Sequence, residues 1–208
     1  AKVLVRKNAE ISAQDEALRA ANARLTAQAN DLFRAATTDP LTALANRGHA
    51  MQQMIELFDR HKAQGARLSL LLIDLDRFKP INDSMGHQFG DRVLIAAARV
   101  LREEMRDGDP LGRYGGEEFI AALPGASADE AMVTAERLRL AMQRRMGTLE
   151  GQAIDLTASI GLAELHETGA GSLSALIAAA DDALYRAKDL GRNRTEIARC
   201  GSDRRKPT

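Results

Sequence analysis

The sequence predicts an α/β domain of the α+β type, with helices flanking a mixed, partly antiparallel central sheet, preceded by a long coiled-coil helix. Three observations support this prediction. Apolar residues recur every seven positions near the N-terminus. Beyond residue 37, apolar runs typical of strands alternate with segments of helical periodicity. A Gly-Gly pair at 115–116 separates two apolar stretches, as in a hairpin.

The first segment, residues 1–36, is predicted to be a dimerising coiled-coil helix. The residues that share one core position of the heptad are Leu4, Ile11, Leu18, Leu25 and Leu32. The other core layer consists of Asn8, Asp15, Asn22 and Ala29. A polar layer of this kind favours a parallel homodimer in fixed register, at some cost in stability. The alternative is an amphipathic helix that packs on its own domain.

A break at 37–40 begins the second segment, residues 37–199, because Asp39 precedes Pro40 and is disfavoured in the helical region. Periodicity predicts helices over 46–64, 88–106, 127–147 and 173–190. It predicts strands over 67–75, 153–163 and 194–199, and a hairpin over 111–123. The polar tail, residues 200–208, is predicted to be disordered.

The hairpin holds the most informative residues of the chain, because two glycines and two carboxylates share one short turn. Glycine at both tip positions permits positive φ and lets a ligand approach the backbone closely. Glu117 and Glu118 are adjacent and cannot both point to one face of a strand. One carboxylate can therefore hold a cation while its neighbour serves elsewhere.

The segment 113–120 resembles the signature turn of the GGDEF family, the diguanylate cyclases, in its variant with Glu at the third position. Other blocks recur in the family's order and extend the resemblance over residues 37–198. They are 39–42, 46–47, 74–79, 82–83, 86–87, 90–91, 159–161, 183–188 and 191–193. The resemblance implies a sheet related to the palm of nucleotide cyclases and polymerases. It also implies an enzyme that condenses two GTP into cyclic di-GMP with release of two pyrophosphates, as a dimer.

A metal site is expected where the buried run 70–73 ends at Asp74. Mg²⁺ prefers hard oxygen ligands and accepts one or two protein carboxylates beside phosphates and water. The resemblance implies that Asp74, Glu117 and the Leu75 carbonyl hold Mg²⁺ or Mn²⁺, and that Glu118 lies near the attacking hydroxyl. The alternative is that Asp74 caps a strand and Glu117 is a turn residue.

Two groups of residues are candidates for phosphate binding. Arg77, Phe78 and Lys79 follow the strand in a turn whose N–H groups can cradle an anion, although Pro80 can redirect that turn. Lys188 and Arg192 are spaced to project from one face at a helix end, where they can clamp a triphosphate. The alternative for this pair is a solvated helix face.

Guanine recognition is expected from Asn82 and Asp91, since an amide and a carboxylate complement the polar edge of guanine. The resemblance implies the same role for both positions. His87 lies between them and is either a ligand contact or a structural hydrogen-bonding residue.

An inhibitory product site is expected at Arg106 and Asp109, whose R-x-x-D spacing lies nine residues before Gly115, as in the family. Arg137 is a candidate second arginine of this site. The alternative is a charged turn after a helix. Ala43 and Ala45 depart from the Gly and Pro that the family often has, which predicts altered coupling between stalk and domain.

Composition narrows the classes of partner. Lys plus Arg and Asp plus Glu number 29 each, so no overall field attracts nucleic acid or an anionic membrane. The longest apolar run, 68–73, is too short for membrane insertion. The lone Cys200 fits a reducing compartment, here the bacterial cytoplasm.

Two rivals to the enzyme are a non-catalytic cyclic di-GMP receptor and a plain coiled-coil scaffold. The first residue is Ala within a helical pattern, which favours part of a longer protein with an upstream sensory domain. Removal of an initiator Met would give the same start.

Overall fold

The computed structural model describes residues 2–199 and divides the chain into two compact units, one on each side of the Thr37–Thr38 bond. The predicted disordered tail, with Cys200, lies outside the described residues. Within residues 2–199, every helix is too short or too polar to cross a membrane.

The first unit is one continuous helix, α1 (Lys2–Thr37). Leu18, Leu25 and Leu32 are 59%, 62% and 71% exposed, so the apolar stripe predicted from the heptads points to solvent along this part of the helix. The side chains of the earlier heptad positions, Leu4, Asn8, Ile11 and Asp15, lie outside the described residues. Pairing of this stripe with a second chain stays a prediction.

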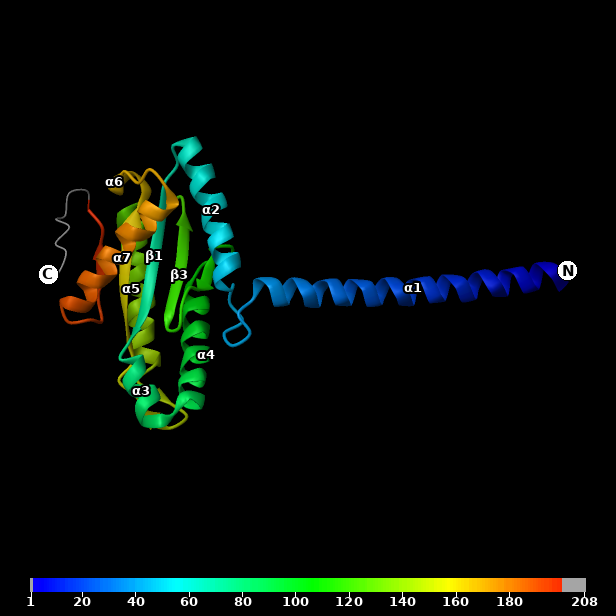
Figure 1. Ribbon diagram of the computed structural model, residues 1–208, viewed down its shortest axis with the longest axis horizontal. Helices are drawn as coiled ribbons and strands as arrows, with labels where there is room; N and C mark the ends of the chain where they lie inside the picture. Colours follow the sequence, from blue (N-terminus) through cyan, green and yellow to red (C-terminus); the bar gives the residue numbers. More distant parts are fainter. Residues whose placement is uncertain (1, 200–208) are drawn as a thin grey trace. The chain divides into compact units, whose positions relative to one another are not determined.

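The second unit is built on a sheet of five strands in the order β2-β3-β1-β6-β7 (Figure 1). These strands are β1 (Leu68–Asp76), β2 (Leu111–Arg113), β3 (Glu118–Pro124), β6 (Thr157–Glu164) and β7 (Thr195–Ile197). The central strand β1 is antiparallel to both of its neighbours, β2 is antiparallel to β3, and β6 and β7 are parallel. The predicted mixed, partly antiparallel sheet is confirmed.

Helices cover both faces of the sheet because the side chains of β1 alternate between two apolar cores. Leu71, Ile73 and Leu75 pack with α4 (His87–Glu104) and α5 (Ala128–Arg145). The other face of β1 packs with α2 (Arg47–Gln64) and α7 (Leu173–Asp189). Asp74 and Asp76 continue the alternation toward the α7 side, where the strand leaves the sheet core.

Helix α7 approaches β6 very closely at Gly161. A Cβ on Gly161 would lie 2.0 Å from the Ala180 carbonyl oxygen and 2.4 Å from the Leu184 amide nitrogen. Only glycine fits this contact without displacing the helix. Because Lys188 lies one turn beyond Leu184, the contact also determines where Lys188 meets the sheet.

Three short elements were not predicted. Helix α3 (Phe78–Met85) occupies the segment predicted as a turn. A short hairpin, formed by β4 (Thr148–Leu149) and β5 (Gln152–Ala153), precedes β6. Helix α6 (Leu165–Thr168) follows β6. Helices α2, α5 and α7 begin at polar caps: Asn46, Ser127 and Ser172 each accept a hydrogen bond from the amide three residues ahead.

Candidate active site

Asp74 is a buried carboxylate at the end of an apolar strand. It is 7% exposed and lies opposite Glu118 on β3 and Ser159 on β6. Burial raises the pKa of Asp74 from 3.8 to about 6; the Lys188 ammonium group lowers that pKa, and the nearby charges of Glu117 and Glu118 raise it further. The predicted acidic residues are therefore close enough to interact electrostatically.

The hairpin that carries Glu117 and Glu118 is tied to β1 through its backbone. The Leu75 amide donates to the Glu117 carbonyl at 3.2 Å, and the Tyr114 and Gly115 amides donate to the Glu118 carbonyl at 2.8 and 3.2 Å. Neither tip glycine has a positive φ, so the turn does not use the left-handed conformation that glycine permits. Gly115 is needed for another reason: a Cβ there would lie 2.5 Å from Glu118 Oε2.

The carboxylates at the end of β1 are the groups that could hold a divalent cation. Within residues 2–199, no three His, Cys, Asp or Glu side chains converge as a ready-made metal cluster. Mg²⁺ commonly takes one or two carboxylates and completes its shell with phosphate and water. Asp74 and Glu117, with the Leu75 carbonyl, offer hard oxygens of this kind. In this structure the Lys188 ammonium lies 2.8 Å from Asp74 Oδ2 and supplies the positive charge.

The segment 77–79 opens a helix rather than a loop. Arg77 precedes α3 with a left-handed backbone (φ 58°) and makes no side-chain cap, so the amides of Phe78 and Lys79 begin the helix without a capping side chain. The N-terminus of a helix attracts anions. The Phe78 side chain is buried, and the exposed Arg77 guanidinium contacts Asp155. Binding by this segment would therefore use backbone N–H groups.

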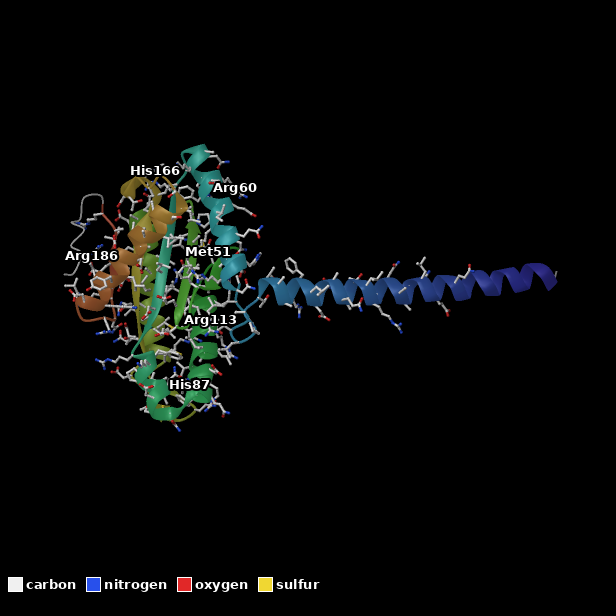
Figure 2. All side chains as sticks on the ribbon, viewed as in Figure 1. Met51, Arg60, His87, Arg113, His166 and Arg186 are labelled. Carbon is white, nitrogen blue, oxygen red and sulfur yellow. The ribbon has the colours of Figure 1, made fainter. Side chains whose placement is uncertain are left out.

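The Asn82 side chain packs on Gly90, the residue before Asp91, across the junction of α3 and α4. A Cβ on Gly90 would lie 1.8 Å from Asn82 Oδ1, so the Asn82 side chain covers the residue that precedes Asp91. Asn82 is half-buried and Asp91 is exposed at the surface. The first residue of α4 is the exposed His87, labelled in Figure 2.

Lys188 and Arg192 do not share a helix face, and that part of the prediction is wrong. Helix α7 ends at Asp189, and Arg192 follows in a loop with a left-handed backbone (φ 64°). Its amide donates to the Ala187 carbonyl at 2.9 Å. The predicted helix 173–190 ends within one residue of α7, and Gly191, with a positive φ, follows the cap residue Leu190. The chain reversal leaves the Arg192 side chain exposed.

Arg113 connects the hairpin to the segment that follows α1, and the sequence analysis missed this role. Its Nη1 donates to both carboxylate oxygens of Asp39 at 3.3 Å, and its Nη2 donates to the Gly116 carbonyl at 2.8 Å. Burial alone would raise the pKa of Asp39, but hydrogen bonds from Thr42 and the charge of Arg113 hold it below its ordinary value. Asp39 and Arg113 are 74 residues apart, so the local sequence pattern carried no signal of this pairing.

The R-x-x-D residues lie beside a hollow at the far end of β3. Its lining residues are Arg106, Asp109, Leu123, Pro124, Gly125, Ala126, Glu130 and Thr134. Burial raises the pKa of Asp109, and the charges of Arg106, Arg102 and Arg137 lower it. Arg137 does not line the hollow; its guanidinium donates to the Glu104 carbonyl at 2.8 Å.

The sequence matches the family described as "Diguanylate cyclase, GGDEF domain" over residues 36–194. The chain belongs to this family. It is 40% identical over 163 residues to diguanylate cyclase DgcP of Pseudomonas aeruginosa, a match that covers 78% of this chain and 24% of that protein. It is 36% identical over 173 residues to diguanylate cyclase A of Treponema denticola, with 82% and 46% covered.

A solved structure extends the similarity to the first unit. The coiled coil and GGDEF domain of DgcB from Caulobacter crescentus, in complex with c-di-GMP, has a TM-score of 0.80 and 32% identity, and covers 90% of this chain and 99% of that one. Among the curated relatives, by contrast, the chain spans less than half of each protein's length.

Proposed function

We propose that this GGDEF chain is a diguanylate cyclase, which joins two GTP molecules into cyclic di-GMP and releases two pyrophosphates. The observation that carries the proposal is the buried Asp74 at a strand end, opposite Glu118 and within electrostatic reach of Glu117. Such a cluster costs free energy unless a cation binds to it. The named relatives and the family match favour GTP as the substrate that brings the cation.

The chain's own residues near the C-terminal end of β1 divide the work of binding between the guanine base and the phosphates. Asn82 and Asp91 hold the guanine edge, because together they offer an amide and a carboxylate that match its acceptors and donors. The amides of Phe78 and Lys79 and the cations of Lys188 and Arg192 hold phosphate oxygens. His87 lies between Asn82 and Asp91 in the sequence and is the candidate third contact to the nucleotide. Lys188 leaves Asp74 when a metal takes its place.

The reaction is a pair of in-line displacements. Each 3′-oxygen bonds to the α-phosphorus of the other GTP, and the bond to the bridging oxygen of pyrophosphate breaks, with its electron pair leaving on pyrophosphate. Glu118 accepts the proton of the attacking hydroxyl. Mg²⁺ or Mn²⁺, held by Asp74, Glu117 and the Leu75 carbonyl, would polarise the α-phosphate and lower the pKa of that hydroxyl. The protein contributes mainly positioning and charge stabilisation.

One domain holds one GTP, so catalysis requires two chains. The exposed stripe of Leu18, Leu25 and Leu32 favours a parallel homodimer through α1, in which the helix pair presents one site to the other. A change of register in this pair is a route by which an upstream sensory domain would control activity. The expected compartment is the bacterial cytoplasm, which contains GTP.

The hollow beside Arg106 and Asp109 supports a second binding site for the product. An arginine can take the acceptors of guanine while an aspartate takes its donors. Bound cyclic di-GMP would then hold two domains apart and inhibit the enzyme, with Arg137 released from Glu104 to join the site. DgcB, the neighbour with the same two-part architecture, was solved in complex with c-di-GMP.

A second candidate function follows from the same hollow: a non-catalytic receptor for cyclic di-GMP that passes the signal to a partner. The intact set of Asp74, Glu117 and Glu118 favours the enzyme, because a receptor has no use for three carboxylates at one strand end.

The proposal predicts that the purified chain converts GTP to cyclic di-GMP in the presence of Mg²⁺. Glu118→Gln should lower the rate by at least about a hundredfold, since general base catalysis contributes that much. Glu56→Gln, on the exposed face of α2, is the matched control and should keep the wild-type rate. Chromatographic separation of the nucleotides measures both.

Wild-type rates in Glu118→Gln would contradict the role given to Glu118. If the folded, dimeric wild-type chain makes no product but binds cyclic di-GMP, the receptor is the better assignment.

A further inference from the structure

Asp76 is a buried carboxylate to which the proposed chemistry gives no role. It is 2% exposed, and both of its oxygens accept hydrogen bonds. Ser159 Oγ donates to Oδ1 at 2.7 Å, Thr157 Oγ1 donates to Oδ2 at 2.7 Å, and the Asn193 amide donates to Oδ2 at 3.1 Å. Among the described residues its partners are neutral donors, and a buried charge of this kind is costly to maintain.

The position of Asp76 suggests what this charge does. Asp74 and Asp76 are alternate residues of β1 and point to the same side of the sheet. Asp74 pairs with Lys188 on the last turn of α7. Asp76 instead holds the backbone of the loop that follows α7. One strand thus anchors both parts of the cationic segment.

The loop has a backbone that needs such support. Gly191, Arg192 and Asn193 have φ of 114°, 64° and 45°, so three consecutive residues lie in the left-handed region. That region is unfavourable for residues with a Cβ, and it persists only where surrounding contacts fix it. The hydrogen bond from the Asn193 amide to Asp76 is one such contact.

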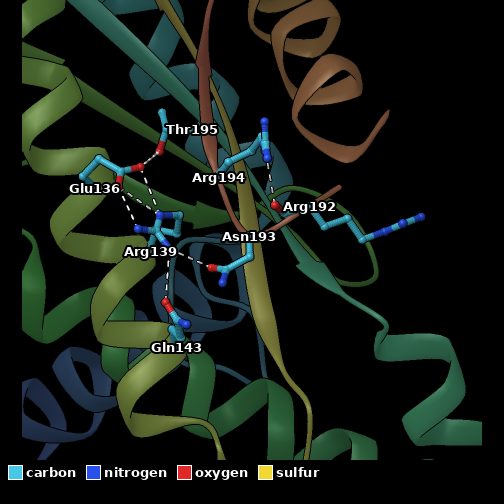
Figure 3. A network of polar contacts seen from close by, with 7 residues as sticks. All are labelled: Glu136, Arg139, Gln143, Arg192, Asn193, Arg194 and Thr195. Carbon is cyan, nitrogen blue, oxygen red and sulfur yellow. Dashed lines mark hydrogen bonds and ion pairs between the residues drawn. The ribbon is translucent and has the colours of Figure 1, made fainter. Parts of the chain in front are cut away.

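A second contact holds Asn193 through its side chain (Figure 3). Arg139 on α5 donates from Nη1 to Asn193 Oδ1 at 2.8 Å and is itself paired with Glu136 at 2.8 Å. Glu136 also accepts from Thr195 Oγ1 at 2.7 Å. The Arg139 side chain is only 14% exposed, which strengthens its charged hydrogen bonds.

Arg192 lies next to this network but its side chain takes no part in it. In Figure 3 the Arg192 guanidinium extends away from Asn193 and Arg139. Within the described part of the chain it has no ion-pair or hydrogen-bond partner. The loop therefore combines a fixed backbone with a free guanidinium, the arrangement that a phosphate-binding arginine requires.

We propose, on the basis of the proposed cyclase function, that Asp76 and Arg139 are positioning residues. They hold Asn193 between them and so fix Arg192 for binding the β- and γ-phosphates of GTP. Asn193 supplies both groups that are held, its amide and its side-chain oxygen. None of the three residues touches the substrate.

The test is a double-mutant cycle between Arg139 and Asn193. Its readout is the affinity for 3′-deoxy-GTP, which lacks the attacking hydroxyl and is not consumed, compared with the affinity for GMP, which lacks the β- and γ-phosphates. Asn193→Gly removes the side-chain oxygen and keeps a residue that tolerates the left-handed backbone. Arg139→Ala removes the other partner, and Arg144→Ala on the exposed face of α5 is the control.

Each single variant should bind 3′-deoxy-GTP about tenfold more weakly than wild type and bind GMP within about twofold of wild type. The double variant should bind 3′-deoxy-GTP no more weakly than either single variant. Asp76→Asn should show the same selective loss. Equal weakening of both nucleotides, additive effects of the two substitutions, or unchanged affinity would overturn the proposal.

Measurements on the wild-type chain distinguish a failure of the positioning role from a failure of the cyclase assignment. If wild type forms cyclic di-GMP while the variants bind 3′-deoxy-GTP normally, only the positioning role is wrong. If wild type binds neither GTP nor its analogue, both proposals are overturned.

Discussion

Ionisation of the buried Asp74 costs free energy of folding, and a bound cation would offset this cost. Its pKa in the folded protein is about 6, above the ordinary 3.8, so the folded state binds a proton more tightly than the unfolded chain. Above pH 6 the ionised carboxylate therefore lowers the free energy of unfolding. As the pH falls from 6 to 4 this cost disappears, because the folded state takes up the proton before the unfolded chain does.

From this we predict that Asp74→Asn raises the free energy of unfolding by about 2 kcal/mol at pH 8, because the neutral amide avoids the burial of a charge. At pH 4 the substitution should have little effect. Thermal unfolding at the two pH values, without metal or nucleotide, measures the difference. Added Mg²⁺ should stabilise wild type and leave the variant unchanged; equal stabilisation of both proteins would place the cation elsewhere.

At the residue scale, sequence reasoning found the groups that stand at the ends of apolar runs. Asp74 and the two glutamates were predictable because a strand pattern stops at each of them. Asp76 and Arg139 were not, because their partner Asn193 lies 117 and 54 residues away and only the folded sheet brings them together. The alternation of Asp74 and Asp76 was the one available signal.

At the contact between α7 and β6, a Cβ on Gly161 would meet the backbone of the helix and not a movable side chain. Gly161→Ala would place a Cβ 2.0 Å from the Ala180 carbonyl, and the backbone of α7 would have to move. We predict a loss of about 3 kcal/mol in the free energy of unfolding. GTP affinity should also fall, because Lys188 follows on the same helix. Chemical denaturation and nucleotide titration measure the two effects.

Gly171→Ala is the matched control for this substitution. Gly171 precedes the same helix, but a Cβ there meets nothing within 4 Å and its φ is not positive. It should leave stability within about 0.5 kcal/mol of wild type. If the two variants unfold at the same denaturant concentration, the close packing at Gly161 does not limit the fold.

At the element scale, periodicity predicted the long helices and the strands to within a few residues, since each presents a clear apolar face. It missed α3 because the eight residues of that helix include Pro80 and Asn82, which are typical of turns. In an α-helix, however, proline is tolerated in the first turn, where the amide has no partner. The short β4–β5 hairpin lacked an apolar pattern altogether.

At the scale of the whole molecule, the proposed reaction needs two copies of a site that is incomplete alone. Each product molecule contains two guanylyl groups, and each domain has one set of Asn82, Asp91 and Asp74. The proposed reaction would therefore require two domains to come together, and the exposed leucines of α1 are the described feature suited to it. The heptad spacing made this pairing predictable in principle, but a single chain shows only one half of it.

We predict that activity depends on α1 at low enzyme concentration. Removal of residues 1–36 should lower the specific activity at nanomolar enzyme by at least about tenfold, because the domains must then meet by diffusion. Activity should recover in part at micromolar enzyme. Measurements of rate and of mass by light scattering, over the same concentrations, test this dependence.

Two matched double substitutions distinguish the effect of the predicted dimer interface of α1 from the effect of the helix being present at all. Leu18→Asp with Leu25→Asp places charges in the predicted core layer, whereas Ala20→Asp with Ala27→Asp places the same charges on the outer heptad position. Only the leucine pair should dissociate the dimer and reduce turnover at nanomolar enzyme. If both pairs behave alike, or if the truncated chain keeps full activity when dilute, the two active sites meet through another surface.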